Sequence, residues 1–372
     1  MQSERTSTFV IKIRCLPILF DLCALLAIGM SLRITTTSGL YHGALRWGSG
    51  NAKKVIAWHG WLDNAATYNY LGPILAEQGY DVIACDHLGH GRSSHLPHGA
   101  SYTYASGVSS MKRVLDSLSQ EDDGWAKPFA HIGHSMSAGQ SVLFAASFPD
   151  MVDRLVLLEG LGPMVAKEGD GPTKMRNAVI NEEHWLSRQT PFVDMSMPKI
   201  YENVQRAIDA RISAVSRHPG DQSISQEAAS AIVCRGTFDA SEDAASKATW
   251  VSGQPLLQVA RGRGHEDEAD TLDSDTFPVR FRHDSRMSLP SHVYMTEEQV
   301  RGFVRCITAP TLLVTAEKGW PFTESVRERI DIMEAQGNLK EHHVLPGYHH
   351  CHLDPDTAGK TAEVVSAFLK AY

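Results

Sequence analysis

The sequence predicts an α/β protein built on a mostly parallel sheet flanked by helices, with a helical cap inserted after the sixth strand. From residue 31 onward, short apolar runs alternate with helix-like stretches, and this alternation predicts the sheet. Most of the runs are apolar on both faces, which is typical of strands buried in a parallel sheet. The alternation stops at residue 163 and resumes near residue 301, which predicts the cap. Because ligands bind beyond the carboxyl ends of strands in such sheets, this cap is expected to wall a pocket.

The individual elements follow in chain order. A hairpin with a Ser38-Gly39 turn is expected first, with strands at 32–37 and 41–47. Four buried strands and three intervening helices come next, with the strands at 54–59, 81–85, 128–132 and 154–158 and the helices at 68–78, 104–118 and 140–147. Beyond the cap, which holds helix-like pieces at 198–216 and 225–234, the core is completed by strands at 311–316 and 341–345 and helices at 324–335 and 357–371.

The chain accordingly divides into an N-terminal leader or extension (1–30), a core (31–162 and 301–372) and a cap (163–300). In the N-terminal part, an apolar run follows Lys12 and Arg14 and is interrupted by Asp21. The run is short for a membrane span, and a carboxylate near its middle costs about 2.5–3.5 kcal/mol. A targeting leader, a membrane anchor and an extension with neither role therefore stay open as interpretations.

Composition narrows the class of protein. The net charge is −8 and no basic cluster is present, which argues against nucleic acid as a partner. The six cysteines are scattered without paired spacing, so we expect free thiols in a reducing compartment, cytoplasmic or organellar. Membrane association is expected only through the N-terminal segment, and no cofactor is predicted.

The strongest chemical motif is G-H-S-M-S-A-G at residues 133–139, between a predicted strand and a predicted helix. A serine in such a sharp turn, with small neighbours on both sides, resembles the nucleophile elbow of the α/β-hydrolases. Ser137 stands where the usual pattern has its last glycine. The resemblance implies that Ser135 is the nucleophile.

The same resemblance assigns two loops that follow predicted strands. H-G-W-L-D-N begins at His59 and corresponds to the loop that donates one main-chain N–H to the oxyanion hole, so the expected donors are Trp61 and Met136. D-H-L-G-H-G-R-S begins at Asp86 and is similar to a loop whose role in the family is structural. We therefore expect structural roles for His87 and His90.

The general base is expected late in the chain, because these enzymes carry their triad in the order serine, acid, histidine. P-G-Y-H-H-C-H follows the last predicted strand, and the family places the base two residues after a glycine, which selects His349. An imidazole with an ordinary pKa near 6.5 can take the serine proton and return it to the leaving group. His350 is expected to point away and His352 to pack nearby. Adjacent residues diverge, so no metal site is predicted.

The acid has two candidates. Many relatives carry it after the seventh strand, where this chain has Glu317 and, at the position of the usual aspartate, Gly319. Other branches place it after the sixth strand, where Glu159 directly follows an apolar run. Glu159 is favoured and Glu317 is the alternative; the acid would fix the tautomer and orientation of the imidazole.

The order and spacing of these segments resemble the α/β-hydrolase superfamily and, within it, the serine hydrolase-like proteins. The lid segments C-R-G-T at 234–237 and R-H-D-S-R at 282–286 are similar to those of that group, whereas an acidic insert at 239–275 departs from it. The resemblance implies a serine hydrolase that cleaves ester-type bonds of a small acyl substrate. A non-catalytic ligand-binding protein and an acyltransferase are the alternatives. We expect Trp61 and His134 to contact substrate, in an apolar pocket to which aromatic residues contribute, candidates being Trp61, Trp185, Phe192 and Trp320.

Overall fold

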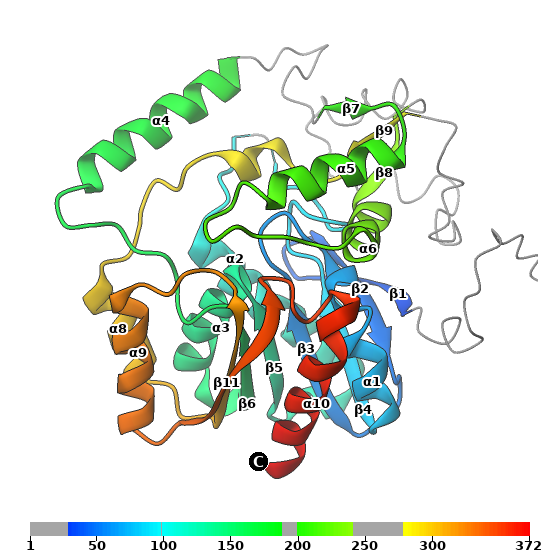
Figure 1. Cartoon of the computed structure of the whole chain (residues 1–372), viewed down its shortest axis with the longest axis vertical. Helices are drawn as coiled ribbons and strands as arrows, with labels where there is room; N and C mark the ends of the chain where they lie inside the picture. The colour runs from blue at the N-terminus through cyan, green and yellow to red at the C-terminus, as the bar shows by residue number, and fades with distance from the viewer. Residues whose placement is uncertain (1–28, 98, 188–198, 241–277) are drawn as a thin grey trace, which may run out of the picture.

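The computed structural model describes residues 29–97, 99–187, 199–240 and 278–372, and Figure 1 shows their arrangement. Its centre is an eight-stranded sheet with the order β1-β2-β4-β3-β5-β6-β10-β11. Every neighbouring pair from β4 to β11 is parallel, whereas β1 pairs antiparallel with β2, and β2 with β4. The predicted mostly parallel sheet and its opening hairpin are therefore confirmed.

The strands of this sheet are β1 (Met30–Thr35), β2 (Tyr41–Trp47), β3 (Lys53–Trp58), β4 (Tyr80–Cys85), β5 (Phe129–His134), β6 (Val152–Leu158), β10 (Thr311–Lys318) and β11 (Leu339–Tyr348). The helices of the core are α1 (Leu71–Glu77), α2 (Tyr104–Glu121), α3 (Met136–Ser147), α8 (Glu297–Arg305), α9 (Glu324–Ala335) and α10 (Pro355–Ala371), joined by the short 3₁₀ turns η2 (Ala65–Tyr68), η3 (Asp123–Ala126) and η4 (Pro149–Met151).

Several of these elements differ from their predicted bounds, among them α3, which begins at Met136 and not at residue 140. Two of the differences have a local cause. The helix expected at 68–78 is split into η2 and α1, because Asn64 accepts a hydrogen bond from the N–H of Ala66 and starts a separate turn earlier. The strand expected at 341–345 runs from Leu339 to Tyr348. It lies at the edge of the sheet, where most of its residues are partly or fully exposed, so its apolar pattern is shorter than the strand itself.

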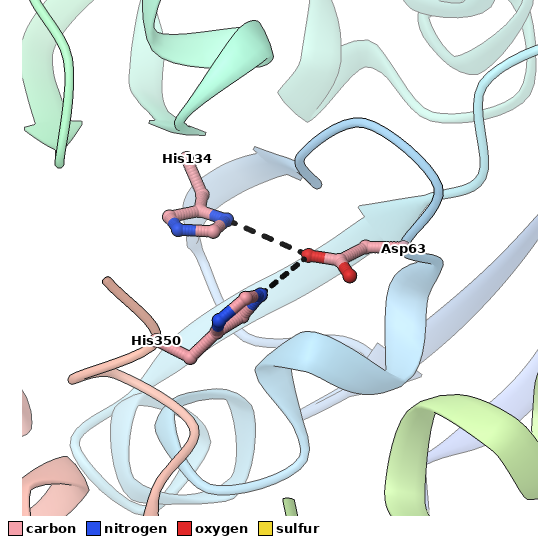
Figure 2. A group of neighbouring side chains, drawn as sticks. All are labelled: Asp63, His134 and His350. Carbon is pink, nitrogen blue, oxygen red and sulfur yellow. Dashed lines mark hydrogen bonds and ion pairs between the residues drawn. The ribbon is translucent and has the colours of Figure 1, made fainter. Parts of the chain in front are cut away.

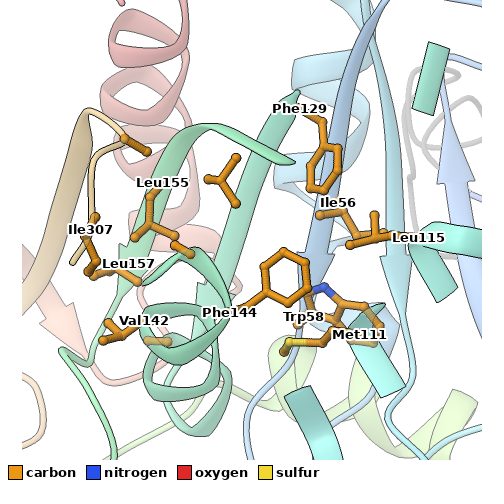
Figure 3. Packing of buried hydrophobic residues seen from close by; sticks show 14 of the residues in the cluster. Ile56, Trp58, Met111, Leu115, Phe129, Val142, Phe144, Leu155, Leu157 and Ile307 are labelled. Carbon is orange, nitrogen blue, oxygen red and sulfur yellow. The ribbon is translucent and has the colours of Figure 1, made fainter. Parts of the chain in front are cut away.

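Side chains alternate between the two faces of the sheet and form two cores. Along β3, Ile56 and Trp58 face a layer made by α2, α3, α8 and α9, whereas Val55 and Ala57 face α1 and α10. Figure 3 shows the first of these cores, in which Phe144 of α3 packs among aliphatic and aromatic side chains of the strands and of α2. Strands covered on both faces explain the continuous apolar runs of the sequence.

Between β6 and β10 the chain forms the cap, which lies over one end of the sheet in Figure 1. Its elements are the helices α4 (Gly171–Ser187), α5 (Val204–Val215) and α6 (Gln226–Gly236), the turn η6 (Ser285–Ser288) and the strands β7 (Ile200–Tyr201), β8 (Thr237–Asp239) and β9 (Val279–Phe281). The strands form a small antiparallel sheet in the order β7-β9-β8. The sequence did not predict this sheet, because strands of two or three residues are too short to show a period.

Three sequence predictions fall outside the described residues: nearly all of the leader, Phe192, and most of the acidic insert at 239–275. Within the described residues, no helix is long and apolar enough to cross a membrane. Among the cysteines that lie there, Cys85, Cys306 and Cys351 are free thiols, as expected.

Candidate active site

Ser135 occupies a strained turn between β5 and α3. Its backbone has φ 54° and ψ −114°, a conformation that costs a residue with a side chain of order 1–3 kcal/mol and clusters at functional sites. Small neighbours permit the turn: a Cβ on Gly133 would lie 2.6 Å from the Ser137 carbonyl oxygen, and one on Gly139 would lie 2.9 Å from that of Gly162. The turn leaves Ser135 and Met136 partly exposed.

Ser137, which replaces the last glycine of the usual motif, is accommodated by hydrogen bonds. It is fully buried, its hydroxyl donates to the carbonyl of His59, and His87 Nε2 lies 2.6 Å from the same oxygen. Because the hydroxyl donates its proton to His59, His87 Nε2–H donates to the Ser137 oxygen. Serine at this position therefore connects the elbow to the loops that follow β3 and β4.

The loop after β3 lies directly against Ser135. A Cβ on Gly60 would be 3.2 Å from Ser135 Cβ and 3.0 Å from His134 Nδ1, so the backbone approaches the elbow as closely as a glycine allows. Met136 is the first residue of α3, where a main-chain N–H has no intrahelical acceptor. Among the hydrogen bonds of the described residues, none is donated by the main-chain N–H of Met136 or of Trp61.

Glu159 and His349 form a buried pair. Glu159 follows β6 with φ 56°, and its Oε2 lies 2.9 Å from His349 Nδ1. Two main-chain N–H groups hold the carboxylate: Ala316 of β10 donates to Oε1 at 2.5 Å, and Trp320 of the loop after β10 donates to Oε2 at 2.9 Å. A carboxylate can only accept a hydrogen bond, so Nδ1 carries the proton of the imidazole and His349 presents Nε2 as its acceptor.

The other candidate acid is not at this site. Glu317 is exposed on β10. Gly319 explains the absence of an aspartate from this loop, because a Cβ there would lie 2.5 Å from Glu159 Oε1 and 2.7 Å from Cδ. A side chain at 319 and the carboxylate of Glu159 would occupy the same space. The structure thus brings Glu159, and not Glu317, to His349.

His349 and the serine turn are joined by His134. His134 Nε2 donates to the carbonyl of His349 at 3.0 Å, and the two rings are 4.8 Å apart. Among the described residues, no hydrogen bond links Ser135 Oγ to His349. In unliganded enzymes such bonds are often long and tighten only when substrate binds. His134 itself is fully buried, so the prediction that it contacts substrate is wrong: the side chain supports the histidine loop instead.

His350 also differs from expectation. It does not point away but lies buried against Asp63 of the loop after β3, with its Nε2 3.2 Å from Asp63 Oδ2 (Figure 2). His134 Nδ1 approaches the same oxygen at 3.7 Å. His352 packs nearby as predicted, 2.9 Å from the hydroxyl of Thr67.

Asp63, His134 and His350 have the donor types of a metal site, with ligand atoms within 4.8 Å of one another. Arg211 of α5, however, forms an ion pair with Asp63. Burial alone would raise the pKa of Asp63, but the Arg211 guanidinium and the nearby imidazoles hold it well below its usual range. Because the carboxylate is already neutralised, a divalent cation would add two uncompensated buried charges. We therefore assign this group as an ion-pair network.

Asp86 has the structural role predicted for its loop. The side chain is fully buried after β4, accepts hydrogen bonds from the main chain of Ala65 and Arg92, and pairs with Arg235 of α6 at 2.8 Å. His90 is likewise buried, which lowers its pKa to about 3. It lies in the interior as a neutral ring.

Three cap residues at this end of the sheet were missed by the sequence analysis as site residues: Arg211, Gln222 and Arg235. Arg235 lies in the lid segment C-R-G-T at 234–237, but nothing in the sequence indicates that it pairs with Asp86. Gln222 is 3% exposed and contacts His349, and no motif surrounds it.

Of the predicted aromatic residues, Trp61 and Trp320 lie near the site. Trp61 is 42% exposed and its indole donates to the carbonyl of Met287 in the cap at 2.9 Å. The ring of Trp320 lies 5.5 Å from that of His349. Trp185 donates to Ser285 Oγ within the cap.

Comparison with known proteins identifies the family. The model of the alpha/beta hydrolase fold family matches residues 54–356. A serine hydrolase-like protein of Dictyostelium discoideum is 30% identical over 340 residues, which cover 89% of this chain and 79% of that protein. A serine hydrolase-like protein of Danio rerio is 37% identical over 133 residues, which cover 36% of this chain and 39% of that protein. The crystal structure of a hypothetical protein from Pseudomonas aeruginosa has a TM-score of 0.68 at 29% identity, covering 92% of this chain and 99% of that one. This chain belongs to the α/β-hydrolase superfamily, and it is similar to serine hydrolase-like proteins.

Proposed function

We propose that this protein is a serine hydrolase that cleaves ester-type bonds through a Ser135-His349-Glu159 triad. One observation carries the proposal. The buried pair of His349 and Glu159 lies next to the serine turn, because His134, the residue before Ser135, donates a hydrogen bond to the main-chain carbonyl of His349. Ser135 itself has a positive φ at the N-terminus of α3. Histidine, oriented by an acid and placed near a strained serine, is the arrangement that activates a hydroxyl for attack.

In the proposed reaction, Ser135 Oγ attacks the acyl carbonyl while His349 Nε2 takes its proton. The main-chain N–H groups of Trp61 and Met136 bind the oxyanion that forms, aided by the positive end of the α3 dipole. His349 then returns the proton to the leaving alcohol, and an acyl-enzyme remains on Ser135. Water deprotonated by His349 hydrolyses this ester and regenerates the serine.

Trp61 and Trp320 favour a substrate with an apolar acyl or aryl group. Both are at least partly exposed, and both belong to loops that follow strands beside the proposed triad. Large aromatic side chains beside a binding site provide much apolar contact area and few polar groups.

The proposal is tested with a fluorophosphonate probe and a series of p-nitrophenyl esters of increasing acyl length. Wild-type protein is expected to be labelled and to hydrolyse the esters, and Ser135→Ala to lose both. Ser147→Ala, at the exposed end of the same helix, is the matched control and should behave as wild type. Labelling that persists in Ser135→Ala, or a folded wild type that is neither labelled nor active, would overturn the proposal.

A further inference from the structure

Gln222 is a buried amide of the cap whose hydrogen bonds are directed at the core. It lies in the connection between α5 and α6 and is 3% exposed. Its Oε1 accepts from the main-chain N–H of His349 at 3.0 Å. Its Nε2 lies closest to the carbonyls of Lys318 and Gly319, at 2.9 and 3.0 Å. Two further carbonyls of its own loop, Pro219 at 3.1 Å and Gly220 at 3.4 Å, complete its surroundings.

The two core loops that Gln222 joins carry the proposed acid–base pair. The loop after β10 supplies the Trp320 N–H that holds Glu159, and the loop after β11 carries the imidazole. Gln222 therefore fixes the backbone on both sides of the Glu159–His349 bond. Both polar main-chain groups of His349 are therefore held by side chains: its carbonyl accepts from His134, and its N–H donates to Gln222.

A second contact supports the same loop from the cap. Arg211 pairs with Asp63, and Asp63 in turn bonds to His350, the neighbour of His349. A third contact lies beyond it: the N–H of Ser225 donates to Asp354 at the start of α10, at 3.0 Å. The cap thus contacts the histidine loop directly through Gln222 and Ser225, and indirectly through Arg211, which acts by way of Asp63.

We propose that Gln222 is a positioning residue through which the docked cap sets the orientation of His349 relative to Glu159. This inference rests on the proposed hydrolase function. Without the amide, the N–H of His349 loses its acceptor, and a displacement of about 1 Å at a catalytic group can cost 10²-fold in rate. The hydrogen bonds of Gln222 go to main-chain atoms and not to a proposed reacting atom, so its effect is expected on turnover and hardly on substrate affinity.

The test compares wild type with Gln222→Met, which keeps the length of the side chain but removes both hydrogen-bonding groups. For Gln222→Met we expect kcat to fall about 10–100-fold, with KM within about threefold. The pH profile of its kcat/KM should differ from that of wild type, because Glu159 and His349 no longer keep their relative orientation. Gln226→Met, the same change at an exposed cap position, should leave all of these unchanged.

Outcomes separate this inference from the proposed function. If wild type is labelled by the fluorophosphonate probe at Ser135, but Gln222→Met keeps its kcat and its pH profile, Gln222 is not a positioning residue and the hydrolase function stands. A lower melting temperature with an unmoved profile assigns Gln222 to cap stability alone and also overturns the inference. A wild type that is not labelled removes the hydrolase function on which the inference rests.

Discussion

His131 and Glu159 lie on neighbouring strands and have opposite surroundings. His131 sits in the middle of β5, fully buried beside Phe144, and neither ring nitrogen has a partner. Burial lowers its pKa to about 3, so the ring is neutral. Glu159 follows the end of β6 and accepts from two main-chain N–H groups and from His349.

The difference follows from the main chain. Inside a sheet, the N–H groups of each strand are used by the ladder of hydrogen bonds, so a buried polar side chain finds no donor there. Where a strand runs past the end of its neighbour, or continues into a loop, those N–H groups are free to bind a carboxylate. Ala316 of β10, beyond the end of β6, and Trp320 of the following loop bind Glu159 in this way. Asp86, at the end of β4, is held in the same way. Charge can therefore be kept at the carboxyl ends of the strands, where the candidate site lies.

The largest expected effect is on turnover, when Glu159 is replaced by glutamine. Glu159→Gln keeps the shape of the side chain but cannot fix the His349 tautomer, so kcat on an active ester should fall about 10³–10⁴-fold. Steady-state kinetics and the melting temperature check this, with Glu317→Gln as the matched control that keeps activity within about twofold. An active Glu159→Gln, or a damaged Glu317→Gln, would show that the acid is assigned to the wrong strand end.

A smaller loss is expected from Gly319→Ala. The added methyl would overlap the Glu159 carboxylate and push it away from His349, so kcat should fall about 10–100-fold. Gly359→Ala on α10 is the control, since nothing lies within 4 Å of a Cβ there; it should leave kcat unchanged and stabilise the helix by about 0.5–1 kcal/mol. If Gly319→Ala keeps full activity, the close approach of that loop is not required.

The smallest expected effects are on the free energy of unfolding, and they concern buried histidines such as His131. Burial lowers the pKa of His42 to about 4 and of His90, His131 and His352 to about 3. Since these folded-state pKa values lie below the unfolded value near 6.5, the unfolded state binds more protons between them. The stability they contribute is complete above about pH 6.5 and is lost on acidification, by about 1.4 kcal/mol per histidine per pH unit.

Urea denaturation at pH 7.5 and pH 5.5 measures this loss, and His131→Phe should reduce it by about 1.4 kcal/mol. At pH 7.5 the same variant should gain about 1 kcal/mol, because two buried nitrogens without partners are removed. The exposed His184→Gln is the control and should keep the wild-type difference. An unchanged pH dependence in His131→Phe would mean that this ring is hydrated or charged in the folded protein.

Prediction from the sequence succeeded where a signal is local. The strand–turn–helix around Ser135 follows from small residues between two apolar stretches, and the parallel sheet from continuous apolar runs. It failed where no local signal exists. The cap sheet consists of strands too short to show a period, and His134 was expected at the substrate although strand packing buries it completely.

The sequence by itself determined the order of the elements and the chemical types at the strand ends: a serine in a sharp turn, a late histidine and two candidate acids. Tertiary structure decided which acid meets the histidine, and it added Gln222 and Arg211 of the cap. The physical reason is distance along the chain. Propensity and period act over a few residues, whereas the bonds that select Glu159 join loops more than 150 residues apart, and only packing brings those together.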